Sequence, residues 1–225
     1  MAAAVGIDLQ ILTATEFYMT RLDAGVRRFR EQCRSAYQAH FQKLSCEGQH
    51  PHTLFITCSD ARVVAHLITQ SLPGELFMVR NVGNIVPPAN QTAHHSTAAA
   101  IEYAVDVLGV GDVVVCGHTQ CGAMSALADG PPQADRLPHL RAWLEQAEAV
   151  RRLLPPHPAD PIRAVTEANI LWGIENLRSY PCVAERVAEG RLRLHGWLFV
   201  IATMEILTWN RDVDRFEPVE TESRS

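Results

Sequence analysis

Short, continuous apolar runs constrain the fold of this chain more than any other feature of its sequence. Residues 113–116 read Val-Val-Val-Cys, and the run at 52–57 leads directly into Cys58. Runs at 76–79 and within 193–206 have the same character. Strands that are apolar on both faces occur where helices cover both sides of a parallel sheet. We therefore predict an α/β fold with a central, mainly parallel β-sheet flanked by helices.

Helical periodicity fills most of the sequence between these runs. Apolar residues three and four apart predict helices over 97–108, 123–128, 137–154 and 162–179. The same spacing over 22–44 predicts an amphipathic helix or helix pair that packs outward from the core. We expect a single structural domain overall, made of an N-terminal helical arm (1–48), an α/β domain (49–216) and a polar tail (217–225).

Two cysteines and a histidine stand where predicted strands end. Cys58 closes the first run, and His118 and Cys121 follow the valine run in the sequence Gly-His-Thr-Gln-Cys-Gly. Ligands gather beyond the carboxyl ends of parallel strands, so these side chains can be neighbours across adjacent strand ends. Two thiolates and one imidazole make three quarters of a tetrahedral zinc shell, and a catalytic zinc keeps its fourth position for water. We predict one Zn²⁺ per chain.

An acid beside the first thiolate leaves the fourth position open to different interpretations. Asp60 follows Cys58 by two residues and precedes Arg62 by two, so it can form a charge-assisted pair with the guanidinium. If Arg62 holds the carboxylate away, the zinc is open; otherwise Asp60 is the fourth ligand of a closed structural site. A further interpretation makes Cys58 a nucleophile with His118 as its base. The phosphatase form of that chemistry needs an arginine six residues after the cysteine, where this chain has Val64.

Composition limits the kinds of binding partner and the cell compartment that we expect for this chain. The formal charge of −5, without a long basic run, argues against a nucleic-acid partner. No apolar stretch approaches the roughly 20 residues needed to cross a bilayer, so we expect no membrane partner. The six cysteines lack the dense spacing of a disulfide scaffold, which favours a reducing compartment, and we expect a cytoplasmic protein. The cysteines outside the metal site are interpreted as small buried hydrophobic residues: Cys33, Cys46, Cys116 and Cys182.

Five motifs follow one another in the first 130 residues. They are CSDARV at 58–63, PGELF at 73–77, RNVGN at 80–84, EYA at 102–104 and GHTQCG at 117–122. In order and spacing, from about residue 49 to 127, they resemble the β-class carbonic anhydrases. The resemblance implies that Cys58, His118 and Cys121 bind zinc. It also implies that Asp60 and Arg62 form a catalytic pair.

The resemblance further implies a substrate pocket and an open zinc site. In the plant-like pattern of the family, the substrate is surrounded by four residues that correspond here to Gln49, Phe77, Val82 and Tyr103. A second pattern, known for a bicarbonate-inhibited closed site, has a tryptophan three residues before the first zinc cysteine. This chain has Phe55 there, so we expect the plant-like, open form. The backbone N–H of Gly122, at a helix start, is a further expected substrate contact.

The implied activity is the reversible hydration of carbon dioxide to bicarbonate and a proton, by attack of zinc-bound hydroxide that Asp60 orients. Because two thiolates donate more charge than imidazoles do, we expect the bound water to need alkaline conditions. Hydrolysis of carbonyl sulfide or carbon disulfide on the same scaffold is one alternative, and a non-catalytic zinc- or bicarbonate-binding protein is another. The smallest unit of the family is a dimer whose N-terminal helices wrap the partner and whose pockets use both chains. We therefore expect a homodimer or a dimer of dimers.

Overall fold

The computed structural model of the protein describes residues 21–90, 95–129 and 136–219, which fall into two units divided between Gln49 and His50. In the first unit, residues 21–28 are helical and continue through the π-helical segment η1 (Phe29–Cys33) into α2 (Arg34–Glu47). The helix predicted over 22–44 is therefore confirmed. No residue of η1 or α2 is buried, so the described part of this unit, from residue 21 on, forms no core of its own.

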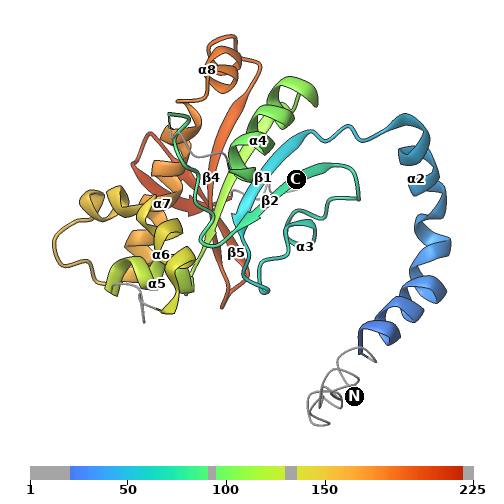
Figure 1. The fold of residues 1–225 in the computed structure, drawn as a ribbon, viewed down its shortest axis with the longest axis horizontal. Coiled ribbons are helices and arrows are strands. Elements are labelled where there is room, and N and C mark those ends of the chain that lie inside the picture. Colours follow the sequence, from blue (N-terminus) through green and yellow to red (C-terminus); the bar gives the residue numbers. More distant parts are fainter. Residues whose placement is uncertain (1–20, 91–94, 130–135, 220–225) are drawn as a thin grey trace, which may run out of the picture. The chain divides into compact units, whose positions relative to one another are not determined.

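A six-stranded sheet forms the centre of the second unit (Figure 1). The strands lie in the order β2-β1-β3-β4-β5-β6. The pairings among the first four strands are parallel, and the last two pairings are antiparallel, which confirms the mainly parallel sheet. The bounds are β1 (Thr53–Cys58), β2 (Leu76–Asn81), β3 (Asp112–His118), β4 (Arg193–Val200), β5 (Glu205–Asn210) and β6 (Arg215–Pro218). β6 thus includes two residues that were expected in the polar tail, and 220–225 lie outside the described residues.

Helices connect the strands of the second unit. They are α3 (Ala65–Thr69), α4 (Ser96–Glu102) with the π-helical η2 (Tyr103–Val107), α5 (Gly122–Asp129), α6 (Pro138–Glu145), the 3₁₀ segment η4 (Glu148–Leu153), α7 (Pro161–Leu177) and α8 (Pro181–Ala188). The single helix predicted over 137–154 is wrong, because α6 ends at Glu145 and Ala147 leaves helical geometry with ψ of 10°. In the described ranges no helix is long and apolar enough to span a bilayer.

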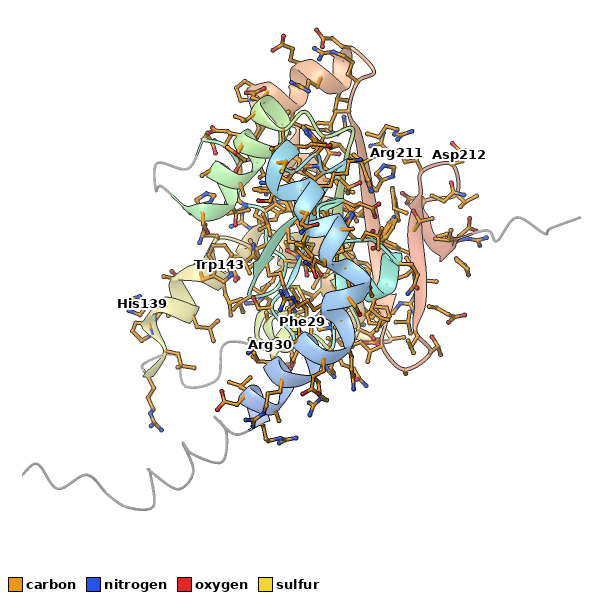
Figure 2. The ribbon with its side chains drawn as sticks, turned by 90° about the vertical axis from the view of Figure 1, so that its right-hand side faces the viewer. Phe29, Arg30, His139, Trp143, Arg211 and Asp212 are labelled. Atoms are coloured by element: carbon orange, nitrogen blue, oxygen red, sulfur yellow. The ribbon has the colours of Figure 1, made fainter. Side chains whose placement is uncertain are left out.

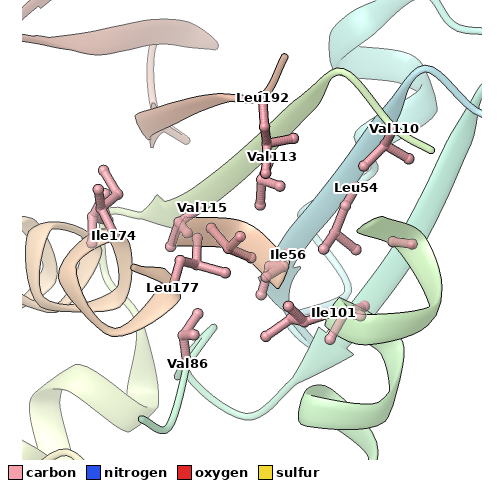
Figure 3. Packing of buried hydrophobic residues seen from close by; sticks show 14 of the residues in the cluster. Leu54, Ile56, Val86, Ile101, Val110, Val113, Val115, Ile174, Leu177 and Leu192 are labelled. Atoms are coloured by element: carbon pink, nitrogen blue, oxygen red, sulfur yellow. The ribbon is translucent and has the colours of Figure 1, made fainter. Parts of the chain in front are cut away.

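The main core lies between one face of the sheet and helices α4, α7 and α8. Alternate residues of β1 and β3 point into it, and α7 contributes apolar residues that meet them (Figure 3). The close-up labels ten of its members: Leu54, Ile56, Val86, Ile101, Val110, Val113, Val115, Ile174, Leu177 and Leu192. Every residue of β1 is buried, which explains why its sequence shows no polar alternation.

The opposite face of the sheet carries a smaller cluster. Phe55 and Val114 are buried there, and the short helix α3 contributes Ala65. This face contains Cys116, which is fully buried as predicted. Cys33 and Cys182 are only half-buried, and the prediction that Cys46 is buried is wrong. Cys46 lies on α2, where no side chain is buried.

Glycine on β4 allows α7 to approach the sheet closely. A Cβ atom at Gly196 would lie 2.9 Å from Ile174 Cδ1 and 3.0 Å from Ile170 Cγ2, both on α7. Something must shift to relieve contacts that short, and both isoleucines are themselves packed in the main core. We therefore treat Gly196 as a packing requirement of the fold.

We predict that Gly196→Ala lowers the free energy of unfolding by about 1–3 kcal/mol, the usual effect of overpacking a core. Urea unfolding followed by circular dichroism measures it. Gly111→Ala is the matched control, because a Cβ there meets nothing within 4 Å. Equal unfolding free energies for the two variants would contradict the packing argument.

Candidate metal centre

The register of β1 and β3 brings two of the predicted ligands to one edge of the sheet. Thr57 pairs with Cys116, so both strands end together, Cys58 closing β1 and His118 closing β3. Past β3 the chain turns through Gln120, which has a φ of 57°, and delivers Cys121 just before α5. Among the described residues, Cys58, His118 and Cys121 are the only group of three or more possible ligands gathered in this way, with donor atoms all within 4.8 Å.

The tautomer and the burial of His118 fit the role of a metal ligand. Its Nδ1 lies 2.9 Å from the carbonyl oxygen of Thr119, which can only accept a hydrogen bond, so Nδ1 carries the proton. Nε2 is then left with a lone pair, and it is buried with no hydrogen-bond partner. A buried imidazole nitrogen without a partner is costly unless something else binds it. Beside two thiols whose sulfurs are 3.9 Å apart, zinc is the ion that this donor set suits best.

The pKa values of the two buried thiols are shifted in opposite directions. A hydrogen bond from the Cys121 thiol lowers the pKa of Cys58, although burial opposes the shift, and the Gly83 N–H also contributes. The Cys58 thiolate in turn raises the pKa of Cys121, and burial acts in the same direction. Burial opposes charge on His118, but the thiolate and the Thr119 carbonyl raise its pKa overall. A bound metal must displace these protons, so metal affinity rises with pH.

Arg62 holds Asp60 beside the cluster through a bidentate ion pair. Arg62 Nε donates to Oδ1 at 2.9 Å and Nη2 donates to Oδ2 at 2.7 Å, while the Arg62 backbone N–H also donates to Oδ1. The Arg62 hydrogen bonds keep the pKa of Asp60 well below its usual range, so the carboxylate is ionised at neutral pH. Oδ2 lies 3.8 Å from His118 Nε2. Asp60 therefore lies next to the three ligands without joining their cluster.

The end of β2 supports the Cys58 segment and the loop that follows β2. Arg80 Nε donates to the carbonyl oxygen of Cys58 at 3.2 Å, and its Nη2 donates to that of Asp60 at 2.8 Å. The Asn81 side chain accepts from the Ile85 N–H and donates to the Ile85 carbonyl, each at 2.9 Å, which closes the loop. Arg80 therefore binds the backbone of the segment that carries Cys58 and Asp60.

Two residues that the sequence reasoning missed also reach this loop. Trp143 on α6, labelled in Figure 2, donates from its indole N–H to the Val82 carbonyl at 2.7 Å. Asn169 on α7 donates from its side-chain amide to the Gly83 carbonyl at 3.0 Å. The Gly83 N–H in turn donates to Cys58 Sγ at 3.4 Å. These contacts span 61, 86 and 25 residues, so no local sequence pattern signals them.

The predicted pocket residues do not all meet in one chain. Val82 follows β2 directly and Gly122 follows Cys121, so both lie at the metal edge of the sheet. Phe77 is four residues earlier on β2 than Asn81, the partner of Cys58, which places it about 13 Å back along the strand. There it contacts Tyr103, with ring centroids 5.7 Å apart. Gln49 belongs to the first unit.

Comparison with known proteins gives one consistent family. A sequence model of the carbonic anhydrase family matches residues 53–206. The carbonic anhydrase of Pseudomonas aeruginosa is 45% identical over 186 residues, which cover 81% of this chain and 83% of that protein. The solved structure of the β-carbonic anhydrase CcaA is similar with a TM-score of 0.85 at 40% identity, over 90% of this chain and 100% of that one. One of two tetrameric β-carbonic anhydrases from Sordaria macrospora has a TM-score of 0.68 at 30% identity, over 87% and 96% of the chains.

We predict that Cys58→Ala abolishes binding of zinc at one ion per chain, because it leaves only two ligands of the cluster. Elemental analysis of the purified variant measures the loss. Cys116→Ala is the matched control, since that thiol is buried on β3 but lies outside the cluster. Retention of a full zinc complement by Cys58→Ala would show that the metal is held elsewhere.

Proposed function

The chain belongs to the β-carbonic anhydrase family, and from that premise we propose that it catalyses the reversible hydration of carbon dioxide to bicarbonate and a proton. One observation carries the proposal. Beside the buried Cys58–His118–Cys121 cluster lies a carboxylate, Asp60, whose two oxygens both accept hydrogen bonds from Arg62. A tetrahedral metal with three protein ligands keeps a position for water, which is the arrangement of a catalytic site.

The donor set indicates what the metal would contribute. Cys58, His118 and Cys121 would hold Zn²⁺, and zinc lowers the pKa of bound water toward neutrality, as hydration chemistry requires. His118 would ligate through Nε2, since Nδ1 is bonded to the Thr119 carbonyl. That second bond fixes the orientation of the ring.

We propose that Asp60 orients the attacking water. Its pKa is depressed, so the carboxylate accepts a hydrogen bond and does not keep the proton. An acceptor fixed by Arg62 turns the lone pair of the water oxygen toward carbon dioxide. The Gly122 N–H, at the start of α5, would donate to a substrate oxygen as negative charge develops there. Val82 would form the apolar wall on this side of the pocket.

We propose that the rest of the pocket comes from a second copy of the chain, in a homodimer or a dimer of dimers. The Phe77–Tyr103 pair lies away from the metal edge of its own chain, and Tyr103 is 44% exposed. The arm, residues 1–48, would bind the partner, because Phe29 and Phe41 expose apolar surface on it. Gln49 and the partner's pair would then complete the site of the 49–216 catalytic domain. A monomer in sedimentation at micromolar concentration with full activity would rule this out.

The cysteines and the apolar wall bear on the compartment and the substrate. Both proposed thiolate ligands must stay reduced, and all six cysteines are free, so we propose a cytoplasmic location. Export of the protein from the cell would contradict it. Carbonyl sulfide and carbon disulfide are linear and uncharged like carbon dioxide, so the same wall would accept them. Turnover measured on carbon dioxide and carbonyl sulfide separates the activities, and we expect carbon dioxide to be preferred.

We predict that Asp60→Asn keeps its zinc but loses about 100-fold in turnover of carbon dioxide, the lower range of effects for positioned acid–base groups. The amide lacks the charge that Arg62 binds, and it offers a weaker acceptor to the water. Stopped-flow hydration and zinc analysis of the same sample measure the two quantities.

Asp212→Asn is the control, an exposed carboxylate on the β5–β6 turn (Figure 2). Unchanged turnover in Asp60→Asn would remove Asp60 from the mechanism. A wild-type protein that binds zinc but hydrates nothing would favour the alternative of a non-catalytic zinc- or bicarbonate-binding protein.

A further inference from the structure

One peptide group is aimed at a proposed zinc ligand. The peptide that joins Val82 to Gly83 donates its N–H to Cys58 Sγ at 3.4 Å. The carbonyl of the same peptide accepts the indole N–H of Trp143 at 2.7 Å. In a planar trans peptide the N–H and C=O point in opposite directions, so the three groups form one chain of hydrogen bonds. Each bond in such a chain polarises the next.

The following peptide is held from another helix. Asn169, fully buried on α7, donates to the Gly83 carbonyl at 3.0 Å. The peptides on both sides of Gly83 are therefore fixed by side chains, one from α6 and one from α7. Neither side chain has a hydrogen bond to Cys58, His118 or Cys121, so each acts through the loop.

Gly83 also packs closely against α5. Its φ is +82°, and a Cβ atom there would lie 2.9 Å from Ala123 Cβ and 2.9 Å from Met124 Cε. Only glycine allows the loop to come this close to the helix that follows Cys121. The direction of the Gly83 N–H is thus fixed by packing as well as by hydrogen bonds.

We propose that Trp143 and Asn169 are positioning residues that hold the Val82–Gly83 peptide dipole against the Cys58 thiolate and so reduce the charge this ligand donates to the metal. The inference rests on the proposed function, because it requires a metal on Cys58. Groups that hydrogen-bond to a metal ligand change how much charge the ligand donates, and so change the properties of the metal. A shell with two thiolates makes zinc a weaker acid, and a hydrogen bond to one of them offsets part of that loss.

Cobalt(II) in place of zinc tests the proposal by spectroscopy. Trp143→Phe removes the indole N–H at the start of the chain of hydrogen bonds. The Gly83 N–H is then less polarised, so the Cys58 thiolate becomes more electron-rich. The sulfur-to-cobalt charge-transfer band is expected to move to lower energy, and kcat/KM of the zinc enzyme for carbon dioxide to fall about tenfold. Trp172→Phe is the matched control. Trp143 and Trp172 both pack against one group of buried residues that includes Met124 and Leu144, but the Trp172 side chain has no hydrogen bond to another described residue. We expect its band to stay at the wild-type position.

Asn169→Ser provides an independent variant, and it decides the matter alone if Trp143→Phe does not fold. A band that stays at the wild-type position in the folded variants, at full cobalt occupancy, overturns the proposal. An equal shift in Trp172→Phe also overturns it, because general packing would then be the cause. If the wild-type protein shows no sulfur-to-cobalt band at all, the metal site itself fails, and the proposed function fails with it.

Discussion

The parallel pairing of β1 with β3 is the constraint on which the rest of the structure depends. It places a thiol and an imidazole at the same edge of the sheet, and the turn after β3 adds the second thiol. The pairing is stable because both strands are apolar on both faces and lie between clusters of buried residues. The sheet therefore positions the proposed ligands, and the loops supply the groups that would alter the charge on them.

Backbone and side-chain donors balance the negative charge gathered at this edge. Arg62 neutralises Asp60, and the Gly83 N–H faces the Cys58 sulfur. Buried thiols and an imidazole without a partner would destabilise the fold if nothing bound them. A divalent cation would resolve this conflict, because the cluster fits a metal site. Folding, protonation and metal binding would then be linked at one site.

Local patterns were sufficient to predict the sheet, most helices and the positions of Cys58 and His118 at strand ends, with Cys121 close behind His118. They failed where long-range contacts decide the structure. The break after α6 interrupts an apolar periodicity that reads as one helix. The bonds from Trp143 and Asn169 to the loop carry no signal, since any residue can accept through its backbone carbonyl. Substrate roles for Phe77 and Tyr103 rest on family resemblance, and the fold places both away from the metal edge.

The most direct measurement is a zinc titration of the metal-free protein, with carbon dioxide hydration followed by stopped flow between pH 6.5 and 9, around the pKa of about 7 for zinc-bound water. The account predicts that hydration is absent without metal, rises in proportion to added zinc and stops rising at one ion per chain. Hydration by the metal-free protein, or full zinc occupancy without hydration at any pH in this range, would contradict it.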